Sequence, residues 1–248
     1  MRSIICILAL LCAIHALEQN VTDPSRNLER LVKIRKAVTE ATFNNISRFE
    51  RRTKQNLEIE LNELKIDALL DIHNTIEEAF ENVDSSVDKG REEGKNVDEC
   101  DDYARNNLET KNTNAIAKLE ACIENGYSAM KDPLANVAII IEAVKKLLID
   151  LDAIMPNCYS PTFLKMQVCV VEKIDLSRAS LDSVSNYAKK VTATAGVTYT
   201  KMIADVRSGI TTNAADIRTF STDIVNYTDN CIRNAPEVPE DPELSTIF

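Results

Sequence analysis

The chain has 248 residues, a formal net charge of −10, five Gly, seven Pro and no Trp. The negative charge argues against nucleic-acid binding, because no surplus of Lys and Arg is available to neutralise phosphates. The scarcity of turn residues argues against β-architectures, and long runs of helix-forming residues predict an all-α fold.

The first 16 residues have the pattern of a signal peptide. Arg2 precedes an apolar run over residues 4–14, and the small residue Ala16 stands at the expected cleavage point. This run is too short to be a transmembrane helix, and we find no other segment able to span a bilayer. We therefore expect a secreted, extracellular protein that is cleaved near residue 16.

A long amphipathic, coiled-coil-like helix is predicted within residues 17–95. From Ser25 to Lys89 the sequence lacks Gly and Pro, and apolar residues recur every three or four positions, which is the spacing of one helix face. Pro24 fits the first turn and Gly90 fits the end. The predicted stripe is Leu31, Ile34, Val38, Thr42, Ile46, Phe49, Thr53, Leu57, Leu61, Leu64, Ala68, Ile72, Ile76, Phe80, Val83 and Val87.

This stripe must be covered, because propensity alone does not stabilise so long a helix. An antiparallel bundle within the chain and a coiled-coil dimerisation arm are the two alternatives. Polar residues also weaken the stripe near residues 42–55, where a kink is the alternative to a continuous helix. Bases dominate residues 26–54 and acids dominate 58–102, so two copies would attract each other as an antiparallel homodimer, unless both faces are simply solvated.

Residues 96–234 are predicted to form a cysteine-containing helical bundle. A second helix is expected over 96–130, then a tight connection at Lys131-Asp132-Pro133 and a third helix over 134–154. After a loop between two prolines, a fourth helical region begins at residue 162.

The fourth region is expected to break within 192–212, because Gly196 and Gly209 lie in a stretch rich in Thr and Ala. The tail, residues 235–248, is acidic and rich in proline, so we expect it to be disordered. The predicted fold is thus an elongated antiparallel helical bundle with one long N-terminal helix.

Five cysteines remain after signal cleavage: Cys100, Cys122, Cys158, Cys169 and Cys231. In an oxidising compartment they are expected to form disulfides, with one left unpaired or bonded between chains.

A hairpin turning at Asp132 would bring Cys122 level with Cys169, which is our first predicted bridge. Cys100–Cys158 is the second predicted bridge, and Cys158–Cys231 is its alternative. Cys100 and Cys122 lie on one helix about 33 Å apart and cannot pair with each other.

Three sequons, at Asn20, Asn45 and Asn226, are predicted N-glycosylation sites.

The sequence contains few residues in patterns suited to catalysis or metal binding. His73 is the only histidine beyond the signal peptide, and an exposed helix histidine is the simplest interpretation. We find no zinc-ligand cluster, EF-hand or phosphate loop, so we expect no metal, no cofactor and no enzymatic activity. Acidic pairs over residues 92–102 could hold calcium loosely, although solvated acids near a helix start explain them better.

The five cysteines in helical surroundings, behind a signal peptide and before the tail Pro236-Glu-Val-Pro-Glu-Asp-Pro-Glu243, resemble insect secreted proteins with the tsetse EP-type domain. The resemblance covers about residues 98–234 and rests on spacing and composition. It implies a non-enzymatic extracellular role in gut or haemolymph, of a kind related to defence.

Taken together, these observations predict a secreted helical protein that interacts with an extracellular protein or with itself. The alternative is an extracellular carrier that holds a lipid or another small hydrophobic ligand between the third and fourth helices.

Overall fold

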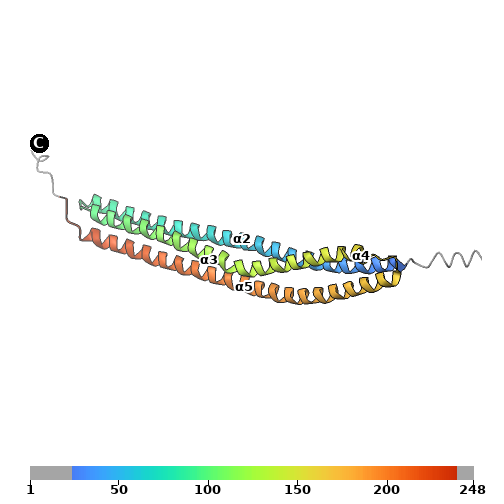
Figure 1. The fold of residues 1–248 in the computed structure, drawn as a ribbon. Coiled ribbons are helices and arrows are strands. Elements are labelled where there is room, and N and C mark those ends of the chain that lie inside the picture. The colour runs from blue at the N-terminus through green and yellow to red at the C-terminus, as the bar shows by residue number, and fades with distance from the viewer. Residues whose placement is uncertain (1–23, 239–248) are drawn as a thin grey trace, which may run out of the picture. The chain divides into compact units, whose positions relative to one another are not determined.

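The computed structural model describes residues 24–238 (Figure 1). Four helices follow one another: α2 (Pro24–Glu92), α3 (Asp98–Asp152), α4 (Ile154–Asn157) and α5 (Phe163–Arg233). The described range has no β-strand beyond an isolated bridge between Lys95 and Glu237. The prediction of an all-α fold with one long N-terminal helix is therefore confirmed. The predicted signal peptide, residues 1–16, and Asn20 lie outside the described residues.

The described chain forms two compact units, and each contains a segment of α2, α3 and α5. Unit 1 comprises residues 24–53 and 133–196, and unit 2 comprises residues 54–132 and 197–238. In neither unit is a described helix long and apolar enough to cross a membrane.

Unit 1 has two apolar clusters. The first contains Leu28, Val32, Leu147, Leu151, Ile154, Cys158, Met166, Val170 and Leu181. The second contains Ile46, Val137, Ile140, Val144, Ala188 and Ala195. Because α2 and α5 contribute earlier residues to the first cluster than to the second, these helices run parallel. The order is reversed for α3, so α3 lies antiparallel to both.

Unit 2 repeats this arrangement around fully buried Leu61, Leu119 and Ile217. Its helices are also joined by polar contacts. The Arg218 guanidinium of α5 donates to both carboxylate oxygens of Asp71 on α2, at 2.6 and 2.8 Å. The Ser86 hydroxyl of α2 donates to Asp229 of α5 at 2.6 Å.

In unit 2 most buried residues of α2 belong to the predicted stripe, whereas in the first turns of α2, in unit 1, neighbouring residues are buried in its place. Ile72, Ile76 and Val83 are buried as predicted. Leu31, Ile34 and Val38 are instead about half exposed, while Leu28, Val32 and Thr39 are buried. The buried stripe is hard to recognise in the sequence because it includes a polar residue, Thr39. The Thr39 hydroxyl donates to the Arg35 carbonyl at 3.0 Å, so this polar residue is accommodated in the core.

α3 continues through the predicted connection at Lys131-Asp132-Pro133, so the prediction of two helices was wrong. Pro133 lies inside the helix. A proline removes one backbone donor, and buried neighbours on both sides compensate for that loss: Met130 and Val137 are fully buried.

α5 is also unbroken through Gly196 and Gly209, where the sequence predicted a break. Gly209 packs closely against α3, because an added Cβ would lie 2.7 Å from the Cys122 Sγ. At this position the glycine allows close helix packing and does not turn the chain.

The corner between α2 and α3 is closed by the end of the described chain. Gly94 has a φ of 74°, which favours glycine where a helix ends. The Asn96 amide donates to the Pro236 carbonyl at 2.9 Å, and the Val238 amide donates to the Gly94 carbonyl at 2.7 Å. The predicted disorder from residue 235 is therefore wrong for residues 236–238, whose backbone groups find partners at this corner.

Candidate functional site

Two disulfides involve four of the five predicted cysteines. Cys100 bonds to Cys231 in unit 2, and Cys158 bonds to Cys169 in unit 1. The predicted bridges Cys122–Cys169 and Cys100–Cys158, and the alternative Cys158–Cys231, are wrong. The error follows from the predicted turn at Asp132: α3 is continuous there, so the hairpin assumed for this pairing does not form.

Cys122 is the free cysteine of the described range. Its side chain is half-buried, and its Sγ lies 3.5 Å from the Val206 carbonyl oxygen on α5. Burial raises the pKa of the Cys122 thiol, because the thiolate would lose hydration. This thiol is consequently a poor nucleophile at neutral pH.

His73 lies on the surface, as the sequence predicted. Two-thirds of its side chain is exposed, and its Nδ1 is 3.8 Å from a Glu77 carboxylate oxygen. Within residues 24–238, no group of three or more His, Cys, Asp or Glu side chains is placed to hold a metal ion. Near the start of α3, the Asp101 carboxylate accepts a 2.7 Å bond from Arg105 and lies 3.6 Å from Arg91.

Both described sequon asparagines are exposed, and each lines a groove between α2 and α5 in its own unit. Asn45 of α2 borders a groove in unit 1 together with Ala188 and Thr192 of α5. Asn226 of α5 borders a groove of about 360 Å³ in unit 2. Glycosylation at these positions stays a prediction.

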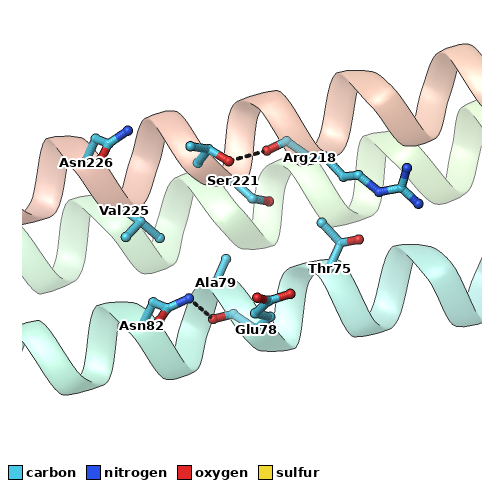
Figure 2. Close-up of a pocket in the computed structure, with 9 residues that line it drawn as sticks. Thr75, Glu78, Ala79, Asn82, Arg218, Ser221, Val225 and Asn226 are labelled. Carbon is cyan, nitrogen blue, oxygen red and sulfur yellow. Dashed lines mark hydrogen bonds between the residues drawn. The ribbon is translucent and has the colours of Figure 1, made fainter.

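The unit 2 groove is lined mainly by polar side chains (Figure 2). α2 contributes Glu78 and Asn82 to the lining, and α5 contributes Arg218, Ser221 and Asn226. The side-chain nitrogen of Asn82 donates to the backbone carbonyl of Glu78 at 2.8 Å, which leaves the Asn82 side-chain oxygen as an acceptor. Ser221 is only 5% exposed, and its hydroxyl has no hydrogen-bond partner.

An apolar surface lies on the first turns of α5, in unit 1. Leu164, Val168, Val171 and Leu176 are 66%, 60%, 42% and 55% exposed. We call these four residues the α5 apolar face. Between residues 198 and 226, by contrast, α5 exposes no large apolar side chain. This face was not among the features predicted from the sequence, although the steps of four and three residues from Leu164 to Val171 were a signal for it.

No known protein family matches the sequence, and no curated protein is similar to it. The resemblance to the tsetse EP-type domain therefore stays a prediction.

Proposed function

We propose that the protein is a secreted, non-enzymatic interaction protein that associates with a second copy of itself through the α5 apolar face. The observation that carries the proposal is the exposure of Leu164, Val168 and Val171 on one short stretch of helix. Contiguous exposed apolar side chains on a folded surface mark interaction sites, because their association removes apolar area from water.

Secretion is supported by two features. The first is the predicted signal peptide, and the second is the pair of disulfides, Cys100–Cys231 and Cys158–Cys169. Such bonds persist in oxidising compartments and are rare in the cytosol.

A second copy is the favoured partner because the charges around the α5 apolar face complement themselves in one orientation. In an antiparallel pair centred on residue 170, Lys165 of one copy opposes Asp175 of the other, and Leu164 opposes Leu176. A parallel pair in register would place Glu172 against Glu172, which is repulsive. The proposed dimer is therefore antiparallel along α5.

Sedimentation equilibrium of the secreted protein tests this proposal. We expect a monomer–dimer equilibrium that Val168→Asp weakens at least tenfold. Lys165→Asp and Asp175→Lys should each weaken it, and the double variant should restore it. Ile139→Asp, at a position on α3 that is 63% exposed, is the matched control and should leave association unchanged. A wild-type protein that stays monomeric at high concentration and low salt would refute self-association.

The alternative function is carriage of a lipid or another small hydrophobic ligand, which the sequence placed between the third and fourth helices and which we propose here for the α5 apolar face. Native mass spectrometry of protein purified from its secretion medium separates the two. If the protein carries a bound lipid mass that is lost in Val168→Asp, the α5 apolar face holds a hydrophobic ligand and does not mediate self-association.

A further inference from the structure

We infer that the unit 2 groove between α2 and α5 holds the first N-acetylglucosamine of a glycan attached to its own rim residue, Asn226. This inference rests on the proposed function in one respect, since the glycan is added only to a protein that enters the secretory pathway. It assigns a binding groove to the sugar, whereas a sequon alone indicates only the residue to which the sugar is attached.

The Ser221 hydroxyl is the first argument. Buried polar groups in folded proteins almost always have a hydrogen-bond partner, and one without a partner reduces stability. Ser221 is 5% exposed, unpartnered and part of the groove lining. A ligand with hydroxyl or amide groups would satisfy it.

The composition of the groove is the second argument. Figure 2 shows Glu78 and Asn82 on α2 across from Ser221 and Arg218 on α5. The groove thus offers carboxylate and amide acceptors on one wall and donors on the other. Its volume of about 360 Å³ falls within the range of small-ligand sites. These groups suit a sugar that carries hydroxyls and an acetamide better than they suit an apolar ligand.

The position of Asn226 is the third argument. Asn226 is exposed and lines the groove, so a sugar bonded to its side-chain nitrogen begins at the rim. In the transfer, the Asn226 Nδ2 forms a bond to C1 of the sugar of a polyprenyl-diphosphate oligosaccharide. The bond from C1 to the diphosphate oxygen breaks, the diphosphate leaves with the electron pair, and the amide loses one proton to the transferase.

The burial of the sequon hydroxyl determines whether glycosylation comes before or after folding. Thr228 is fully buried, and its hydroxyl donates to the Ile224 carbonyl at 2.9 Å. A transferase that reads this hydroxyl cannot reach it in the folded protein. Transfer at Asn226 therefore precedes the packing of α5, and the helix closes with the sugar already attached.

The test uses the full chain secreted from cultured insect cells. Peptide mass spectrometry should find Asn226 occupied, and an endoglycosidase that leaves one N-acetylglucosamine should not change the Tm. We expect Asn226→Gln to lower the Tm by about 2–4 °C, the shift that corresponds to one lost hydrogen bond in a chain of this size. Asn45→Gln is the matched control, because it removes a sequon whose groove has no comparable buried hydroxyl among its lining residues.

Ser221→Ala separates a sugar contact from a purely structural role. In the glycosylated protein it should lower the Tm as much as Asn226→Gln does. In the Asn226→Gln background it should leave the Tm unchanged or raise it, because it then removes an unsatisfied hydroxyl. Equal losses in both backgrounds would overturn the inference.

Two further outcomes would overturn the inference and leave the proposed function intact. One is a secreted, disulfide-bonded protein in which Asn226 is unoccupied. The other is an Asn226→Gln protein whose Tm equals that of the glycosylated wild type, which would show that the sugar makes no stabilising contact in the groove. Failure of the proposed function looks different, since the protein would then either be secreted as a monomer or stay inside the cell with reduced cysteines.

Discussion

Cys100 and Cys231 are separated by 131 positions in the sequence, and their disulfide holds the two Cα atoms 5.8 Å apart. The bond ties the first turn of α3 to the last turn of α5. It therefore fixes the end of unit 2 at which the chain also makes its corner between α2 and α3.

The two disulfides should contribute unequally to stability. A bond that closes a longer loop removes more entropy from the unfolded chain, and the loop-entropy relation gives about 5 kcal/mol for Cys100–Cys231 and about 3 kcal/mol for Cys158–Cys169. Urea unfolding of the two paired Cys→Ala variants measures the difference. An equal or larger loss for Cys158–Cys169, whose separation is 11, would contradict this entropic account.

Two glycines should respond in opposite directions to substitution by alanine. A Cβ at Gly90 would lie 2.6 Å from Ile232 and 2.7 Å from Val97, two β-branched side chains with little freedom to move. Gly90→Ala should lower the unfolding free energy by about 1–3 kcal/mol.

At Gly196 the added Cβ would meet no atom within 4 Å other than those of its chain neighbours and of the backbone of its own helix, so Gly196→Ala should raise the unfolding free energy by about 0.5–1 kcal/mol. Thermal unfolding of the two variants side by side checks both signs. Stabilisation by Gly90→Ala would show that α2 is packed more loosely there than the structure indicates.

Tyr199 should make the fold sensitive to alkali. Burial, with a smaller contribution from nearby Glu60, raises the pKa of Tyr199 to about 12, above its ordinary value of 10. Because the folded state keeps this phenol neutral, its contribution is complete below pH 10 and is lost as the pH rises towards 12. The slope of unfolding free energy against pH in this window should become shallower in Tyr199→Phe, and an unchanged slope would exclude Tyr199 as its source.

Pro133→Ala should stabilise α3. The alanine restores a backbone donor and removes the clash of the proline ring with the preceding turn, for a gain of about 1–3 kcal/mol. Circular dichroism should report unchanged helix content together with a higher Tm. Ala135→Pro, at an exposed position of the same helix, is the opposite control and should destabilise. A lower Tm for Pro133→Ala would mean that the proline has a required conformational role.

The sequence predicted the start of α2 correctly and its end to within a few residues, because strong local signals lie there. Pro24 opens the helix as predicted, whereas the predicted stop, Gly90, lies inside it: α2 ends at Glu92, two residues before Gly94, which has the positive φ that a helix end favours. Period and composition likewise sufficed for the all-α class. Such signals act within a few residues and need no knowledge of the partner helices.

Tertiary packing decided the features that the sequence did not reveal. Pro133 and Gly209 are usual helix breakers, yet each lies inside a long helix with buried neighbours. The wrong turn at Asp132 then misplaced the cysteines, so one local error led to two wrong bridges. The Ser221 hydroxyl could not have been identified either, because being buried without a partner is a property of three packed helices.

Because the backbone of residues 236–238 pairs with the α2–α3 corner, the folded part of the chain extends beyond the end of α5. The last helical residue is Arg233, but the Val238 amide is bonded to the Gly94 carbonyl. A truncation placed at the helix end would therefore expose the Gly94 carbonyl and the Asn96 amide to water and free the corner. Any shortened version intended for crystallisation or for fusion to another domain should keep the chain through Val238.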